Sequence, residues 1–298
     1  MATEMTHEPF HAFAFDGVLG LGLDGLALAP EFSFFGQMIA QGKVKEPVFG
    51  VFLADSDDEV SELCFGGHQA ERVRAGLTWA PIASPELGYW QVSIRAIRVG
   101  NRTLDFCSDG TCRAVVDTGT SLLAVPRAFS AELQSELEGP LRDPPPGTAP
   151  GLSREEEVDC RKAEGALLHF DIEGPAIHTL TLGPGDYSRP SIQLFDEEED
   201  AAEGEQADAP GAAAAGGPVV EPRTRCQPTL MAIDLPEPLG PKLFIMGEPV
   251  LRKYYTVYDW QEKRVGFGLA IHTSDAHVEE PAPAPERPTL RRRKPLLL

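Results

Sequence analysis

Basic residues are scarce in this sequence of 298 amino acids, which has 26 Lys and Arg against 46 Asp and Glu and a formal net charge of −20. Its one dense basic block, 291–294, lies at the extreme end. Because nucleic-acid binding requires a concentrated basic face, we expect no nucleic-acid partner. Long apolar runs are also missing. None approaches the ~20 residues that cross a bilayer, so we expect no membrane span.

Two further patterns are absent. The first nine residues have neither the basic nor the apolar region of a secretory signal, so we expect no signal peptide in this chain. The seven histidines are scattered and no Cys-x-x-Cys pair occurs, so the spacing that is typical of a zinc site is missing. We therefore expect no metal centre.

The five cysteines form an odd set. Cys107 and Cys112 enclose Ser-Asp-Gly-Thr, whose turn-forming residues can bring the two sulfurs together at the end of a hairpin. Cys160 and Cys226 are the second candidate pair. Cys64 is left over, and we expect it to be a small apolar residue in a strand. Two disulfides would indicate an oxidising compartment, which conflicts with the missing signal.

The rest of the pattern favours a mainly β fold with short helices. Strand-like segments, short and bounded by turn residues, occur at 13–15, 48–53, 91–99 and 179–182. Two stretches have apolar residues at helical spacing after a proline and before a glycine, and they predict short helices at 30–42 and 126–139.

Three stretches depart from the composition of a folded domain: 139–157, 196–224 and 271–298. They are rich in Pro, Gly, Ala or acidic residues, and none has an apolar period that could offset the entropy of ordering. We expect the first two to be disordered insertions and the third to be a disordered, Pro-rich basic tail.

The strongest chemical signal is the string Ala-Val-Val-Asp-Thr-Gly-Thr-Ser-Leu-Leu at 114–123. An apolar strand delivers the carboxylate of Asp117 into a loop of hydroxyl residues and one glycine. Hydroxyl and backbone N–H groups of such a loop can hold both carboxylate oxygens. The string therefore predicts an ionised, fixed carboxylate.

With its neighbours, this string resembles the C-terminal portion of the pepsin-like aspartic endopeptidases. The segments that carry the resemblance follow in the family's order: 15–22, 64–67, 88–92, 114–123, 243–259 and 265–268. The resemblance implies a bilobal β fold with a substrate cleft between the lobes, each of which contributes one aspartate. It also implies chemistry by carboxylates and water alone, without a cofactor.

The resemblance assigns roles to individual residues. Asp117 resembles the catalytic aspartate of the C-terminal lobe, in a loop supported by Thr118, Gly119 and Thr120. Thr118 would be a buried hydroxyl that links the two aspartate loops, and Thr120 would bind the outer carboxylate oxygen. The same resemblance assigns Cys107–Cys112 to a short loop disulfide and Cys160–Cys226 to a long bridge.

Other positions resemble parts of the cleft and its support. Tyr89 and Val115 resemble residues that line the cleft. The segment 245–247 would lie beneath the Asp117 loop, and 15–22 would be the matching support in the N-terminal lobe.

Only one Asp-Thr-Gly occurs in the sequence, and no Asp-Ser-Gly. We therefore expect an N-terminally truncated form, with residues 1–82 as the remnant of the N-terminal lobe and interlobe region, 83–270 as the complete C-terminal catalytic lobe, and 271–298 as tail. The first aspartate would lie outside this chain, which as it stands would be inactive.

Two other interpretations are open: an obligate homodimer that pairs two Asp117 loops, and a non-catalytic peptide-binding module. The expected partner is a peptide or protein substrate, with a missing N-terminal-lobe segment or a second copy completing the site. A full-length form would be secretory, vacuolar-lysosomal or extracellular. Asn101-Arg102-Thr103 is a glycosylation sequon on an expected hairpin turn, usable only in the secretory pathway.

Overall fold

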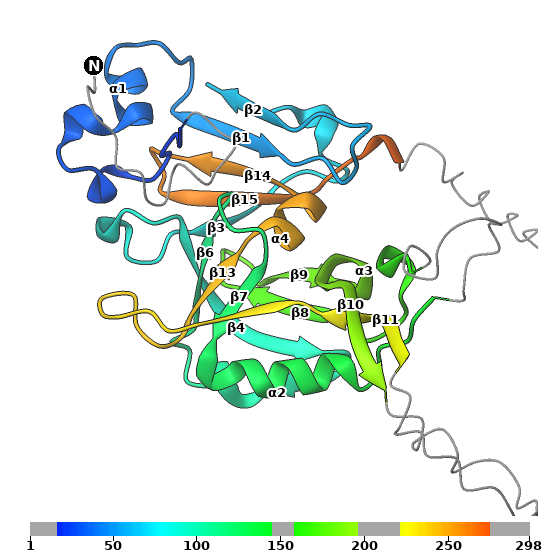
Figure 1. The fold of residues 1–298 in the computed structure, drawn as a ribbon. Coiled ribbons are helices and arrows are strands. Elements are labelled where there is room, and N and C mark those ends of the chain that lie inside the picture. Colours follow the sequence, from blue (N-terminus) through cyan, green and yellow to red (C-terminus); the bar gives the residue numbers. More distant parts are fainter. Residues whose placement is uncertain (1–16, 145–157, 196–220, 275–298) are drawn as a thin grey trace, which may run out of the picture.

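The computed structural model describes residues 17–144, 158–195 and 221–274 (Figure 1). These residues form a mainly β protein with a few short helices, as the sequence predicts. Within them, no helix combines the length and apolar character that crossing a membrane requires. The expected strand at 13–15 lies outside the described residues.

Five strands, from both ends of the described chain, form the upper sheet of Figure 1. Their spatial order is β2 (Glu62–Phe65), β1 (Val48–Phe52), β14 (Tyr254–Asp259), β15 (Arg264–Leu269) and β3 (Thr78–Pro81). The pairing of β1 with β14 is antiparallel and joins residues some two hundred positions apart in the sequence, such as Phe49 and Tyr258. The sheet therefore crosses the expected domain boundary at residue 82.

Eight strands form the second sheet. Their order is β12 (Leu230–Ile233), β7 (Leu123–Pro126), β13 (Leu243–Met246), β6 (Arg113–Val116), β4 (Gln91–Val99), β8 (Leu168–Ile172) and β9 (His178–Leu182), with β5 (Arg102–Leu104) paired to β4. At its centre, β13 runs parallel to β6. A two-stranded ribbon, β10 (Ser188–Phe195) and β11 (Glu221–Pro228), is separate from both sheets.

Short helices lie between the strands along the chain. The α-helices are α1 (Phe34–Ala40), α2 (Arg127–Glu138), α3 (Pro184–Tyr187) and α4 (Glu248–Lys253). The 3-10 helices are η2 (Asp24–Leu26), η3 (Pro30–Phe32), η4 (Ala70–Arg72), η5 (Pro85–Leu87), η6 (Asp105–Cys107) and η7 (Cys160–Lys162). Along α2, Phe129, Leu133 and Leu137 recur every four residues and are fully buried, which fixes its packed face.

Strand β4 shows how the sequence sets the burial pattern. Val92 and Ile94 are fully buried, but the next buried pair is Ile97 and Val99, so the alternation shifts by one residue. The pairing with β8 has a register irregularity between Ile94 and Ala96. An extra residue in one strand produces this change of face, because side chains alternate with a period of two.

One apolar cluster joins the two sheets. Phe49 and Tyr258 of the five-stranded sheet stack with their ring centroids 4.6 Å apart. Trp90, directly before β4, packs edge-on against Tyr258 at 5.2 Å. These rings are buried and belong to the same cluster as Val92 and Val116. The aromatic contacts therefore hold the sheets together next to the Asp117 loop.

Both expected disulfides are present, with Cα atoms 5.4 Å apart for Cys107–Cys112 and 5.5 Å apart for Cys160–Cys226. Cys64 lies partly buried in β2 as a free thiol. The helix expected at 126–139 and the strand expected at 91–99 are confirmed as α2 and β4. The stretch 30–42 divides into η3 and α1, and the strands expected at 48–53 and 179–182 are β1 and β9.

The expected unstructured stretches extend too far into the fold. Residues 221–224 belong to β11 and pair with β10, so the insertion does not reach 224. In the first stretch, Arg142 forms an isolated bridge with Glu164. At the C-terminus, His272 is buried, so the tail does not begin at 271. The composition did not predict these bounds correctly. A polar residue that pairs with a strand or with a buried side chain is of the same type as a polar residue in a loop.

Candidate active site

Asp117 lies directly after β6, and its backbone is held from below by β13. Its N–H donates to the carbonyl of Met246 at 3.1 Å, which continues the parallel pairing of Val116 with Met246. The segment 245–247 therefore lies against the Asp117 loop. At Gly247, any Cβ would collide with the backbone carbonyl oxygens of Thr120 and Leu122, so this contact requires glycine.

Both oxygens of the Asp117 carboxylate accept a hydrogen bond from its own loop. The N–H of Gly119 donates to Oδ1 at 2.9 Å, and the hydroxyl of Thr120 donates to Oδ2 at 2.6 Å. The carbonyl of Thr120 in turn accepts from the N–H of Glu248 at 2.9 Å, at the start of α4. These contacts fix the orientation of a partly buried carboxylate.

Thr118 does not lie where the resemblance placed it. Its side chain is exposed and has no hydrogen-bond partner among the described residues, so the expectation of a buried, linking hydroxyl is wrong for this structure. The physical reason is that the described part of the chain contains no second Asp-Thr-Gly loop to cover it.

The carboxylate faces a cavity of about 450 Å³ between the two sheets. Tyr89, Val115, Asp117, Thr118 and Gly119 all line it, so the structure brings the expected cleft and loop residues together. The remaining walls are mostly apolar and include Leu21, Leu26, Phe49, Leu235, Leu239, Ile245 and Tyr258. Such a lining suits apolar side chains of a bound peptide.

Residues 18–22, of the expected N-terminal support, form part of this wall. The indole N–H of Trp90 donates to the carbonyl of Leu21 at 2.8 Å, and the N–H of Leu23 donates to Gly88 at 2.8 Å. Val18 and Leu19 are nevertheless exposed, with 76% and 52% of their surface accessible. Residues 15 and 16 lie outside the described part of the chain.

Several residues of the cavity were not predicted from the sequence, among them Leu235, Leu239 and Tyr258. Leu235 and Leu239 flank Pro-Glu-Pro, and apolar residues on both sides of such a turn were the available signal. Tyr258 comes from the five-stranded sheet and is buried. Burial raises the pKa of its phenol, and the negative charge of Asp117 raises it further, so the hydroxyl stays protonated at acidic and neutral pH.

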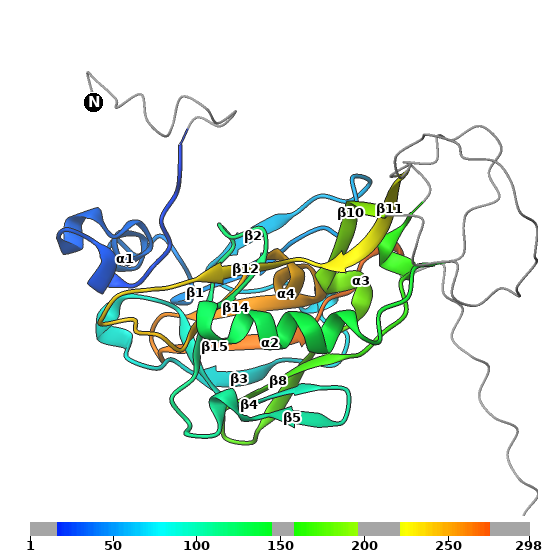
Figure 2. The ribbon, with the colours of Figure 1, turned by 60° about the horizontal axis from the view of Figure 1, so that its bottom comes forward.

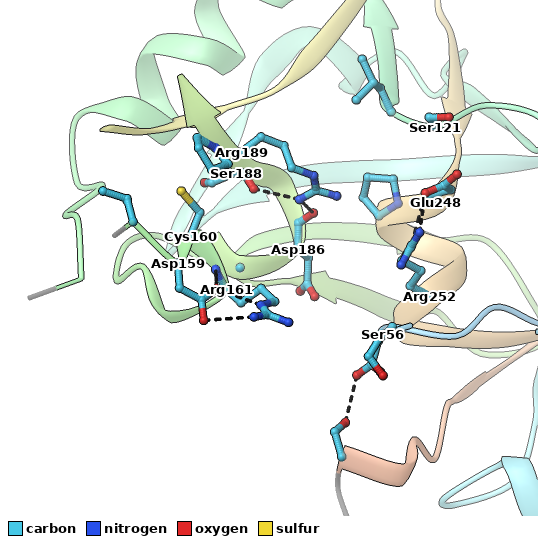
Figure 3. Close-up of a pocket in the computed structure, with 17 residues that line it drawn as sticks. Ser56, Ser121, Asp159, Cys160, Arg161, Asp186, Ser188, Arg189, Glu248 and Arg252 are labelled. Atoms are coloured by element: carbon cyan, nitrogen blue, oxygen red, sulfur yellow. Dashed lines mark hydrogen bonds and ion pairs between the residues drawn. The ribbon is translucent and has the colours of Figure 1, made fainter. Parts of the chain in front are cut away.

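A larger cavity, of about 730 Å³, lies elsewhere and is lined by none of the expected catalytic or cleft residues (Figure 3). Its charged side chains pair with one another: Arg161 with Asp159 at 2.8 Å, and Arg252 with Glu248 at 2.9 Å. Lys253 pairs with Asp186, which also lines it. Because these charges are already satisfied, size alone does not make this cavity the candidate active site.

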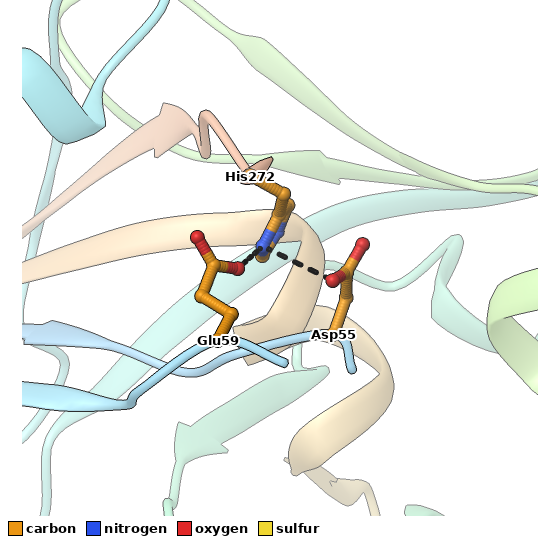
Figure 4. A group of neighbouring side chains, drawn as sticks. All are labelled: Asp55, Glu59 and His272. Atoms are coloured by element: carbon orange, nitrogen blue, oxygen red, sulfur yellow. Dashed lines mark hydrogen bonds and ion pairs between the residues drawn. The ribbon is translucent and has the colours of Figure 1, made fainter. Parts of the chain in front are cut away.

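Asp55, Glu59 and His272 have the right donor atoms for a metal ion and lie close together (Figure 4). However, Nδ1 of His272 contacts Glu59 Oε2 at 2.8 Å, and Nε2 contacts the carbonyl of Arg252 at 2.6 Å. A carbonyl oxygen only accepts, so Nε2 carries a proton. Glu59 Oε1 also accepts from Arg72 at 2.9 Å. We interpret this group as a buried ion network rather than a metal centre.

The fold and the Asp-Thr-Gly loop together define a pepsin-like acid-protease architecture. The family model for eukaryotic aspartyl proteases matches residues 1–187, and the chain belongs to this family. It is 32% identical to vacuolar protease A of Neurospora crassa over 90% of this chain and 56% of that protein. It is also 32% identical to cathepsin E of Mus musculus, over 90% of this chain and 58% of that protein. The chain thus spans little more than half the length of these relatives.

Proposed function

We propose that Asp117 is one of the two aspartates of an aspartic endopeptidase. The observation that carries this proposal is the carboxylate itself, held through both oxygens by Gly119 and Thr120 at the wall of an apolar cavity. In peptide hydrolysis, one carboxylate takes a proton from water while a protonated partner polarises the carbonyl oxygen. Asp117 can fill one of these roles.

A single carboxyl group cannot be ionised, as the group that takes the proton from water must be, and protonated, as the group that polarises the carbonyl must be, at the same time. Because the sequence has one Asp-Thr-Gly, the second carboxyl group would come from polypeptide that this chain does not contain. The exposed hydroxyl of Thr118 and the exposed Val18 and Leu19 support this proposal, since they leave room for another segment beside the loop. We expect the chain alone to be inactive.

The test is to express residues 1–298 and assay an acidic-pH peptide substrate with and without a statine-type transition-state mimic. We expect no turnover above background. Robust turnover that the mimic inhibits and Asp117→Asn abolishes would contradict inactivity. If the chain alone is inactive, sequencing the transcript for an upstream Asp-Thr-Gly or Asp-Ser-Gly would identify the source of the second carboxyl group.

The apolar walls, including Leu235 and Leu239, favour a second candidate: a non-catalytic module that binds extended apolar peptides. Peptide binding that survives Asp117→Ala, with no turnover in any longer form, would support it. A homodimer that pairs two Asp117 loops predicts turnover that rises with the square of dilute protein concentration. Sedimentation that shows monomer alone would exclude the dimer.

We also propose that the protein works in the secretory pathway or in a vacuolar-lysosomal compartment. The two disulfides support an oxidising environment. The relative in Neurospora crassa is named as vacuolar. Fractionation of cells that express the natural gene, with an antibody to this chain, tests the compartment directly.

A further inference from the structure

The structure assigns an N-linked glycan to Asn101, at the tip of the hairpin that joins β4 to β5. Asn101 lies between the paired residues Val99 and Arg102 and is exposed. Its side-chain amide has no hydrogen-bond partner in the described part of the chain. Thr103, the hydroxyl residue of the sequon, is exposed as well. This inference rests on the proposed secretory compartment.

The hairpin presents the sequon without strain. Gly100 occupies the first turn position with a φ of +56°, a left-handed conformation that glycine adopts readily. Asn101, at the second position, does not have a positive φ. The N–H of Gly100 donates to the carbonyl of Leu167 at 2.8 Å, and Arg102 pairs with Glu136 of α2. The turn is therefore anchored from both sides, while the amide of Asn101 points to no protein partner.

The position is compatible with the proposed function. Strand β4 starts beside the cleft, where Gln91 pairs with Val115, and ends at Val99 next to the turn (Figure 2). Val99 lies eight residue steps of extended chain beyond Gln91, or roughly 25 Å. A glycan on Asn101 would thus project from the end of the sheet opposite Asp117 and leave the cleft open.

The chemistry is a group transfer from a polyprenyl-diphosphate-linked oligosaccharide, which we name as the co-reactant. Nδ2 of Asn101 forms a bond to the anomeric carbon of the first sugar, and the bond from that carbon to the phosphate oxygen breaks. Nδ2 loses one proton, and the polyprenyl diphosphate leaves with the bonding electron pair. The transferring enzyme recognises Asn-x-Ser/Thr, and Arg102 satisfies its exclusion of proline.

The sequence makes the test unusually clean, because Asn101 is the only asparagine in all 298 residues. The full chain, preceded by a cleavable signal peptide, is translated with microsomes. We expect one discrete increase in mass that an N-glycosidase removes. Asn101→Gln and Thr103→Ala should abolish it, and the conservative variant Thr103→Ser should retain it.

Import is verified by protection from added protease and by formation of both disulfides. Imported, protected chain without the mass increase would overturn the assignment, and so would a glycosidase-sensitive increase that persists in Asn101→Gln. If microsomes give the increase but protein recovered from its own cells carries no sugar, the proposed compartment is contradicted and the site is supported. The two proposals therefore fail by different results.

Discussion

The indole N–H of Trp90 donates to the backbone carbonyl of Leu21, so a residue directly before β4 holds the segment that forms one wall of the Asp117 cavity. Trp90 is also packed against Phe49 and Tyr258, with ring centroids 5.7 and 5.2 Å apart. One side chain thus joins the two sheets and the N-terminal wall.

Trp90→Phe keeps an aromatic ring at this contact but removes the hydrogen bond to Leu21. We compare it with Trp260→Phe, because Trp260 is similarly buried but has no hydrogen-bonded indole in the described part of the chain. Trp90→Phe should lower the free energy of unfolding by about 1 kcal/mol more than the control. Urea unfolding measures this difference, and hydrogen exchange at the N–H of Leu23 should quicken. Equal losses in both variants would mean that the Trp90 hydrogen bond contributes nothing.

Gly247→Ala tests the support beneath the Asp117 loop. Its Cβ would collide with the carbonyl oxygens of Thr120 and Leu122, which are backbone atoms and cannot rotate away. We expect the free energy of unfolding to fall by about 3 kcal/mol, as for severe overpacking. Gly67→Ala is the matched control, since nothing lies within 4 Å of its added Cβ. Similar thermal midpoints for both variants would contradict the close approach.

The buried ion network predicts a structural role for His272. Glu59 has 1% and His272 has 9% of its side chain exposed, so removing the imidazole leaves a buried carboxylate with fewer partners. His272→Ala should destabilise the fold by about 3 kcal/mol. Ser274→Ala, which removes an exposed hydroxyl bonded to Asp55, should have little effect. The comparison is made by urea unfolding at neutral pH, and a stability of His272→Ala like that of the control would show that the network is dispensable.

The pair of Arg98 and Asp171 predicts a pH dependence. Arg98 donates from Nε and Nη2 at 3.0 and 2.8 Å, and these bonds hold the pKa of Asp171 below its ordinary value. As the pH falls, the carboxyl group of Asp171 is therefore protonated in the unfolded state at a higher pH than in the folded state. The pair stabilises the fold above about pH 4, and this stabilisation is lost at lower pH.

Asp171→Asn should therefore lower stability by about 1–2 kcal/mol at pH 6, and the gap to the native protein should close towards pH 3. Asp234→Asn is the control, because its pair with Arg127 is mostly exposed and should contribute about 0.5 kcal/mol or less. Urea unfolding at several pH values gives both gaps. A gap for Asp171→Asn that stays constant with pH would contradict the assignment.

The elements best predicted from the sequence have local end signals. The C-terminal end of β4 was predicted because Gly100 and Asn101 mark its turn, and α2 was predicted because Pro126 and Gly139 flank its apolar face. The Asp117 loop was predicted because its hydroxyls and glycine are adjacent in sequence. In each case, the residues that determine the local structure are adjacent in the sequence.

What the sequence did not predict depends on distant partners. Residues 221–224 look like an insertion until β10 pairs with them, and His272 looks like tail until Glu59 contacts it. The burial of Thr118 was inferred from the family, yet it requires a second loop that no described residue supplies. Composition and periodicity report on neighbours in sequence, and these three features are set by neighbours in space.

The order of the five-stranded sheet has a consequence for synthesis. Strands β1 and β2 leave the ribosome early, but β14, which lies beside β1, begins only at Tyr254. Some 190 residues after Phe65 must still be translated, which takes roughly 10 to 40 s at common rates of elongation. During that interval the edge of β1 has no strand to pair with. The nascent chain should therefore need a chaperone to cover this hairpin until the last strands arrive.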